Sequence, residues 1–326
     1  MIISKTPLRL SFVGGGSDIP DYYREHGGAV LATSIDKFVY ITVNKRFDET
    51  LRVSYSQTEE VDTAEHLQHR LFRAVLMKLG ISGGLEITSI ADVPSRGSGL
   101  GSSSAFTVGL LHCAYAYKGI YKSKSDLAAE ACEVEIDILN EPIGKQDQFG
   151  AAMGGLNVIR FNPDDTIDVE PVLAPAGVIE AVERSMLMFY TGKTRSASAL
   201  LRQQSEDMKA SQDKRNAMKR MVELVDVMRR ELGGANVGTV GDILHESWLL
   251  KRSLSGGIST GTIDEAYQAA RAAGATGGKL LGAGGGGFMV FFAPPEQHER
   301  IKASLGHLRH VDFRFERQGT SIIFYH

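Results

Sequence analysis

The sequence predicts an α+β protein in two parts, and three observations carry that prediction. The chain has 326 residues, more than one hydrophobic core usually organises, since single cores stop growing near ~250–300 residues. Strand-like and helix-like runs occur together in both halves, which favours two mixed layers over one doubly wound sheet. The stretch 162–177 carries three prolines and little periodicity. We therefore expect a boundary there, between domains 1–170 and 171–326.

The elements of the first half follow from the spacing of apolar residues, which alternates in strands and recurs every three or four positions in helices. We expect strands at 1–13, 85–93 and 154–161, a hairpin of 37–47 with 51–56, and helices at 64–80, at 104–117 and after a cap at Ser125.

The second half gives the same mixture. We expect strands at 185–192, 311–316 and 320–325, helices at 197–231, 238–254, 262–273 and 295–305, and a strand, glycine loop and strand at 277–292.

Composition and charge exclude several function classes. The net charge is −3, with 43% hydrophobic and 23% charged residues, so we expect no nucleic-acid partner, which usually needs a basic surface. No apolar run approaches the ~18 residues that span a bilayer, and the first residues lack the apolar core of a secretion signal. Cys113 and Cys132 lie in apolar helical patterns and are expected to be buried free thiols. We expect a cytoplasmic protein without a membrane partner.

Three glycine clusters, at 14–16, 97–101 and 282–287, each end a strand-like run. A single cluster is usually a plain turn, but glycine also lets backbone N–H groups approach a ligand closely. The middle cluster, "PSRGSGLGSSSAF" at 94–106, follows a strand and precedes a helix. Because a helix N-terminus presents unpaired N–H groups and a positive dipole, this position suits a phosphate.

Two common phosphate motifs do not explain these clusters. A P-loop would need glycine five residues before Gly192, where Leu187 stands. The spacing G-x-G-x-x-G occurs from Gly282 to Gly287, but the strand-like run "FMVFF" follows it where a dinucleotide site requires a helix.

Taken together, the three clusters resemble the three signatures of the GHMP kinases. "TPLRLSFVGGGSD" (6–18) is similar to the first signature, "PSRGSGLGSSSAF" to the second and "KLLGAGGGGFMV" (279–290) to the third. The resemblance implies an N-terminal, ATP-binding domain like domain 2 of ribosomal protein S5, and a ferredoxin-like C-terminal domain. It also implies ATP and Mg²⁺ in the cleft between them. The residues expected to wrap the phosphates of ATP are Pro94, Gly97, Ser98, Gly99, Leu100, Gly101, Ser102, Ser103 and Ser104.

The same resemblance implies the catalytic pair. Asp147, in the G-x-x-D-Q form of the galactokinase branch, matches the aspartate that accepts the hydroxyl proton. Arg9 matches the arginine that keeps this aspartate ionised and stabilises charge on the transferring phosphoryl group. Glu135, twelve residues before Asp147, matches the magnesium-binding glutamate, with Ser103 as its partner. Glu133 is the rival acid, and which of the serines contacts the metal is left open.

The acceptor is indicated by the first signature. Asp18 matches an aspartate that binds sugar hydroxyls, whereas Gly15 and Gly16 replace the two polar residues of galactokinases and leave room for a bulkier acceptor. The stretch 7–48 is similar to bacterial D-glycero-D-manno-heptose 7-phosphate 1-kinases, which act in the supply of nucleotide-activated heptose for surface polysaccharide. The residues expected at the acceptor are Gly15, Gly16, Ser17, Asp18, Lys193, Arg195, Gly284 and Gly285, with Arg195, or Arg195 and Lys193, binding the substrate phosphate.

Three alternatives stay open from the sequence. The chain could phosphorylate a neutral sugar such as fucose, arabinose or galactose. It could sense sugar and ATP without turnover, although the catalytic residues are present. It could act on an isoprenoid or amino-acid alcohol, although the G-x-x-D-Q form favours sugars. A homodimer is compatible with the sequence, which gives no direct sign of one.

Overall fold

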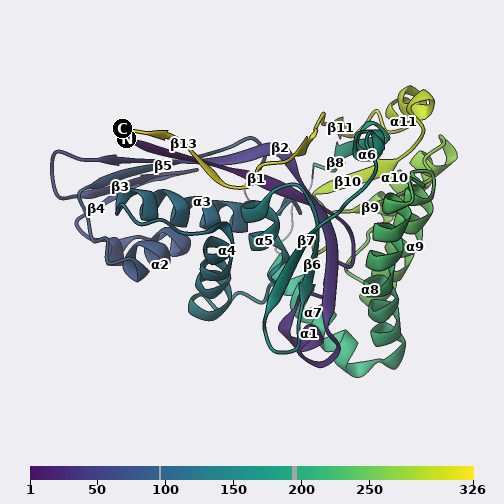
Figure 1. The fold of residues 1–326 in the computed structure, drawn as a ribbon, viewed down its shortest axis with the longest axis horizontal. Helices are drawn as coiled ribbons and strands as arrows, with labels where there is room; N and C mark the ends of the chain where they lie inside the picture. The colour runs from purple at the N-terminus through teal and green to yellow at the C-terminus, as the bar shows by residue number, and fades with distance from the viewer. Residues whose placement is uncertain (95–96, 193–196) are drawn as a thin grey trace.

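The computed structural model describes residues 1–94, 97–192 and 197–326, and within them the chain forms two sheets that lie side by side (Figure 1). Both sheets are largely antiparallel and both carry helices, so the predicted α+β class is confirmed. None of the described helices is long and apolar enough to cross a membrane.

The larger sheet is built around two long strands, β1 (Ile2–Val13) and β2 (Gly28–Lys45), which pair antiparallel along almost their whole length. Three strands pair with β2 one after another, from its first residues to its last. They are β6 (Leu156–Phe161), β12 (Phe315–Glu316) and β5 (Leu85–Ala91). β3 (Leu51–Ser54), β4 (Thr58–Val61) and β7 (Ile167–Pro171) extend the sheet, and β13 (Ser321–Tyr325) pairs with β1.

The predicted hairpin of 37–47 with 51–56 is wrong. β5 pairs with the edge of β2 from Val39 to Lys45, so β3 cannot reach that edge. β3 instead pairs parallel with β5 and antiparallel with β4. The residue pattern identified both strands, but the hydrogen-bond partner was decided by a strand thirty residues further along the chain.

Helices cover one face of the larger sheet below the strands in Figure 1. They are α2 (Arg70–Lys78), α3 (Ser102–Tyr117), α4 (Lys124–Cys132) and α5 (Gln146–Met153). α3 is buried on nearly every side and packs on β1 and β2, which explains its apolar character all round. The two cysteines are free and buried there, as predicted.

Several helix boundaries differ from the sequence prediction. The expected helix at 64–80 is a 3₁₀ turn, Ala64–His66, followed by α2, because the His69 side chain caps α2 by accepting a hydrogen bond from Phe72 N. Ser125 is not a cap; Ser123 is, in a capping box with Asp126. A π-helical turn, Glu133–Ile138, continues α4. The short helices α1 (Pro20–His26), α5 and α6 (Val178–Arg184) were not predicted.

The smaller sheet has the order β11-β8-β10-β9, formed by β8 (Met186–Tyr190), β9 (Gly277–Leu280), β10 (Phe288–Phe292) and β11 (Arg309–His310). Its helices are α7 (Ala197–Ala210), α8 (Gln212–Gly233), α9 (Thr239–Leu254), α10 (Gly261–Ala272) and α11 (His298–Ser304), with a 3₁₀ turn at Pro295–Gln297. The predicted helix at 197–231 is two helices, because Ser211 adopts an extended backbone conformation between them.

The chain does not remain in the smaller sheet to its end. β12 and β13 return to the larger sheet, and Met1 and His326 exchange hydrogen bonds at the chain ends, which lie together in Figure 1. One hydrophobic core also joins the two parts, since Val225 and Met228 of α8 pack with residues of β1 and β2. The larger sheet therefore takes two of its strands, β12 and β13, from the C-terminal side of residue 171, and the two parts have one core in common.

Candidate functional site

A cleft of about 1090 Å³ lies where the two parts meet. Its walls come from the end of β1 with the turn after it, the 97–104 loop, the start of α5, and then α7, α9 and the loop after β9. All three glycine clusters of the sequence contribute to this cleft. Tertiary folding thus brings together segments that lie more than 250 residues apart.

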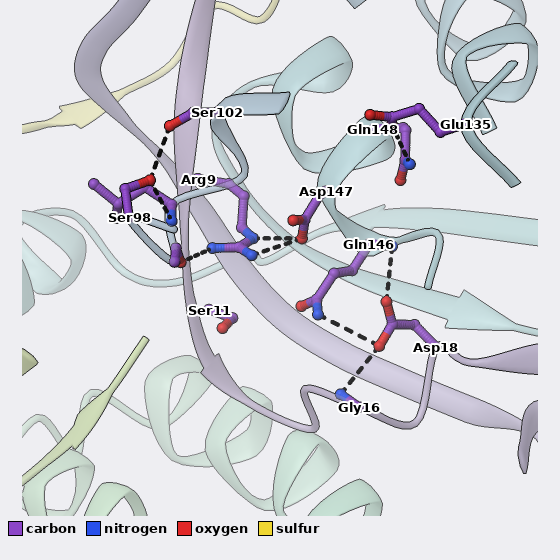
Figure 2. A network of polar contacts seen from close by, with 12 residues as sticks. Arg9, Ser11, Gly16, Asp18, Ser98, Ser102, Glu135, Gln146, Asp147 and Gln148 are labelled. Carbon is purple, nitrogen blue, oxygen red and sulfur yellow. Dashed lines mark hydrogen bonds and ion pairs between the residues drawn. The ribbon is translucent and has the colours of Figure 1, made fainter. Parts of the chain in front are cut away.

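The glycine–serine loop takes the conformation that its residues permit. Gly97, Gly99 and Gly101 all have left-handed backbones, with φ of 64°, 77° and 73°, and α3 starts directly after them at Ser102. The Ser98 hydroxyl hydrogen-bonds the Ser102 hydroxyl at 2.9 Å and accepts from Leu100 N at 3.3 Å, as Figure 2 shows in part. These hydrogen bonds hold the loop in place at the N-terminus of α3, where Ser102, Ser103 and Ser104 line the cleft.

Two predicted members of this loop point elsewhere. The Leu100 side chain is fully buried, and its backbone serves the loop instead, since its carbonyl accepts from Arg9 N at 3.0 Å. Pro94 is exposed and does not line the cleft.

The segment that holds the third glycine cluster packs against the second cluster and forms a hydrogen bond with it. A Cβ on Gly99 would lie 2.4 Å from the Leu281 carbonyl oxygen, and Phe288 N donates to Ser98 O at 3.2 Å. Gly282 and Ala283 line the cleft. Gly284 and Gly285, expected at the acceptor, instead pack against Ile258, whose carbonyl accepts from Gly285 N at 2.9 Å.

Arg9 and Asp147 form the central ion pair of the cleft, shown in Figure 2. Arg9 Nε and Nη2 each lie 2.7 Å from Asp147 Oδ1, and Arg9 Nη1 donates to the Gly99 carbonyl at 2.6 Å. The Arg9 side chain is 3% exposed and that of Asp147 is 25% exposed. Asp147 sits in the first turn of α5. Because Arg9 contacts only Oδ1, the second carboxylate oxygen of Asp147 remains available to a ligand. The guanidinium itself is fixed to the glycine loop by its bond to Gly99.

Asp18 lies beside this pair and is held by three donors. Its carboxylate accepts from Gly16 N at 3.0 Å, Gln146 N at 3.1 Å and Gln146 Nε2 at 3.4 Å. Burial raises the pKa of Asp18, and the negative charge of Asp147 raises it further, while the hydrogen bonds oppose both effects. Ser17, predicted with Asp18, does not line the cleft, because its hydroxyl exchanges hydrogen bonds with Ala29 N and O.

Glu135 and Ser103 lie together on the side of the cleft near α3. Ser103 Oγ donates to Glu135 Oε1 at 3.1 Å, and Gln148 Nε2 donates to Glu135 Oε2 at 2.6 Å. Burial raises the pKa of Glu135 to about 7, against hydrogen bonds that lower it. Glu133 points away and binds Lys78 at 2.7 Å, so Glu135 is the acid that faces the cleft. Among the described residues, no cluster of three His, Cys, Asp or Glu side chains could hold a metal without further ligands.

Two buried lysines in the cleft were missed by the sequence analysis. Lys251 of α9 donates to Gly15 O at 3.2 Å and Gln204 Oε1 at 3.1 Å, and Lys279 of β9 donates to Ser11 O at 2.9 Å and Phe12 O at 3.1 Å. Each is 6% exposed. Burial lowers the pKa of Lys251 to about 8 and that of Lys279 to about 7, where Lys251 and Arg9 contribute a further lowering. A lysine in an apolar helix or strand pattern gives no sequence signal of this kind.

A group of hydrophobic residues lines another part of the cleft, together with polar neighbours such as His69 and Ser89. The hydrophobic residues are Val39, Leu71, Ala91, Val93 and Phe106. This part can receive a flat, weakly polar group attached to a phosphate chain held at the loop.

Lys193 and Arg195, predicted to bind a substrate phosphate, lie outside the described residues. The helix that follows them does reach the cleft, where Ser198 and Leu201 of α7 line it and Ser198 Oγ donates to Glu141 Oε2 at 3.1 Å.

Comparison with known proteins gives one consistent result. The profile of the GHMP kinases N terminal domain matches residues 63–155, and that of the GHMP kinases C terminal domain matches residues 228–308. The chain is 30% identical to the D-glycero-alpha-D-manno-heptose 7-phosphate kinase of Campylobacter jejuni, over 98% of both chains. It is 28% identical to the bifunctional fucokinase/GDP-fucose pyrophosphorylase of Arabidopsis thaliana, over 88% of this chain and 29% of that protein.

Among solved structures, a D-glycero-D-manno-heptose 1-phosphate kinase from Bacteroides thetaiotaomicron superposes with a TM-score of 0.81, at 24% identity and over the full length of both chains. A likeness at this identity establishes the fold.

Proposed function

The chain belongs to the GHMP kinase family, and from that premise we propose that it transfers a phosphoryl group from ATP to the anomeric hydroxyl of D-glycero-D-manno-heptose 7-phosphate. The observation that carries the proposal is the Arg9–Asp147 pair, fixed to the glycine loop at the centre of the cleft. Full-length similarity to a heptose 7-phosphate kinase supports the choice of acceptor.

Asp147 is the residue that takes the proton from the acceptor hydroxyl. Arg9 occupies one of its carboxylate oxygens, so the other is available for that hydroxyl. The same guanidinium lies against the Gly99 carbonyl, next to the phosphate-binding loop. From there its positive charge stabilises the negative charge that develops during transfer.

The residues present fit a nucleotide and a divalent cation. At the N-terminus of α3, Gly99 packs closely against the Leu281 carbonyl and Gly101 against Arg9 and Asp147, so the loop presents its backbone to the cleft. Glu135 and Ser103 are oxygen donors of the type Mg²⁺ prefers. When bound, ATP supplies the phosphoryl group, and Mg²⁺ neutralises the phosphate charge.

Asp18 and the Gly15–Gly16 turn are assigned to the acceptor. Both glycines line the cleft beside Asp18, and the absence of side chains there leaves the wall open to a substrate larger than a hexose. Asp18 accepts hydrogen bonds from the acceptor's hydroxyl groups with the carboxylate capacity that Gly16 and Gln146 leave unused.

The test is a coupled ADP-release assay with ATP and Mg²⁺. The acceptor panel is D-glycero-D-manno-heptose 7-phosphate, sedoheptulose 7-phosphate, mannose 6-phosphate, galactose, fucose and arabinose. We expect turnover on the aldoheptose 7-phosphate. Asp147→Asn should lower kcat about 10²- to 10⁴-fold, the usual contribution of a general base, while calorimetry shows ATP still bound.

Asp312→Asn, at a fully exposed carboxylate, is the matched control and should not change kcat. Turnover on a neutral sugar alone would discard the proposed acceptor and keep the kinase. ATP binding without turnover on any acceptor would favour a sensor.

A further inference from the structure

Lys251 and Lys279 are buried ammonium groups that line the cleft without forming an ion pair, although the charge of Asp18 acts on Lys251 from a longer distance. The other two basic side chains lining it are each paired with an acid, Arg9 with Asp147 and Arg70 with Glu141. Within the described parts of the chain, neither lysine has a carboxylate within ion-pair distance. Because a buried charge without a counter-charge is costly, a pair of such ammonium groups in an open cleft indicates an anionic ligand.

Each lysine has one N–H donor left to bind a ligand, and the two differ in which groups surround them. An ammonium group has three N–H donors. Lys279 is directed at two carbonyls of β1 and lies close enough to Arg9 for their charges to interact. It therefore belongs with the phosphoryl-transfer centre. Lys251 contacts Gly15 O and Gln204 Oε1, next to the turn that faces the acceptor.

A second unused donor lies beside Lys251. Gln204 is fully buried, its Oε1 accepts from Lys251, and its Nε2 has no hydrogen-bond partner. Both donors face Gly16, since a Cβ on that residue would lie 2.7 Å from Gln204 Nε2 and 3.1 Å from Lys251 Nζ. Gly16 thus leaves the space that these two donors occupy, and of the two side chains it is Lys251 that lines the cleft. An oxygen-rich partner would satisfy the remaining N–H donor of Lys251.

We propose that Lys251, positioned by Gln204, binds the phosphate group of the acceptor and makes the site select a phosphorylated sugar. This inference rests on the proposed function, in which Gly15, Gly16 and Asp18 face the acceptor. It adds a specificity-determining residue in α9 and a positioning residue in α7. The charge of Lys251 favours a phosphate oxygen over a neutral hydroxyl, because an ammonium without a carboxylate gains most from an anion.

The experiment compares four proteins, the wild type, Lys251→Met, Gln204→Glu and Lys219→Met, with D-glycero-D-manno-heptose 7-phosphate and with the same heptose lacking phosphate. Lys251→Met should raise KM for the sugar phosphate about 10- to 100-fold, the effect of losing one hydrogen bond to a charged group. KM for ATP and KM for the unphosphorylated heptose should stay within about twofold of wild type. Lys219, exposed on α8, supplies the matched loss of a lysine away from the cleft.

Gln204→Glu tests the charge separately from the fold. It keeps the size of the side chain and its contact with Lys251 but gives the ammonium an anionic partner. KM for the sugar phosphate should rise while the fluorescence melting curve of Trp248, buried in the same helix as Lys251, stays as in wild type. A role of Lys251 in folding alone predicts no rise in this variant.

Three results overturn the inference: an unchanged KM for the sugar phosphate in Lys251→Met, an equal rise for both heptoses, or an unchanged KM in Gln204→Glu. Failure of the proposed acceptor is read from the wild type alone. If another sugar phosphate of the panel is the substrate, the same variants test Lys251 with that compound. If the wild type accepts only neutral sugars, the inference fails as well.

Discussion

Replacing Lys279 with methionine should change how the stability of the protein depends on pH. Lys279 is 6% exposed and its pKa falls from 10.5 to about 7 on folding, mainly because burial disfavours the ammonium. Between those two values the unfolded chain binds a proton that the folded protein does not. The wild type is therefore destabilised as pH falls from 10.5 to about 7, and below that range the difference is constant.

The magnitude follows from the same two values. A fall from 10.5 to about 7 corresponds to about 5 kcal/mol, and most of it, about 3–4 kcal/mol, is expressed between pH 10 and pH 7. The substitution also leaves the carbonyls of Ser11 and Phe12 without their donor, at about 1–3 kcal/mol each. We therefore expect Lys279→Met to be less stable than wild type at pH 10, and to recover about 3–4 kcal/mol relative to it at pH 7.

The assay is urea unfolding between pH 6 and pH 10, followed by the fluorescence of Trp248, the single tryptophan, which is fully buried. Lys302→Met, on the surface helix α11, is the control and should show the same difference from wild type at every pH. If Lys279→Met also gave a constant difference across the range, the ammonium would not be destabilised in the fold and the reasoning would be refuted.

Two further substitutions test the nucleotide end of the cleft. Glu135→Gln removes the acidic donor beside Ser103 and should raise the Mg²⁺ concentration for half-maximal activity about tenfold or more; an unchanged Mg²⁺ titration would place the cation elsewhere. Gly99→Ala strains a left-handed residue by about 1–2 kcal/mol and adds a clash with the Leu281 carbonyl, so it should lower the unfolding midpoint and raise KM for ATP. Gly119→Ala has the same backbone strain with open space around it, and equal losses in both variants would contradict the clash.

Much of the site could be predicted because its chemistry is local in sequence. The glycine–serine loop requires left-handed residues directly before a helix, and glycines at 97, 99 and 101 satisfy this without help from the rest of the fold. The aspartate and glutamate were predicted from the resemblance of their segments to those of the GHMP kinases, and the structure brings Asp147 to Arg9 and Glu135 to Ser103.

Residues in the same motifs were harder to assign. Ser17 and Gly285 stand in signature segments, yet one bonds to Ala29 and the other to Ile258 rather than facing the cleft. A signature tells which segment approaches a ligand, but the direction of each side chain depends on the neighbouring strand or loop. That neighbour is not part of the motif.

The sequence by itself determined the α+β class, most of the strands and helices, and the glycine–serine loop before α3, because these depend on periodicity and on backbone freedom over a few residues. Only the tertiary structure decided that β5 lies between β2 and β3, that β13 returns to β1, and that Lys251, held by Gln204, and Lys279 reach the cleft. The physical reason is common to all three. Each depends on backbone groups from distant segments, and a carbonyl that will accept a hydrogen bond carries no mark in the amino-acid sequence.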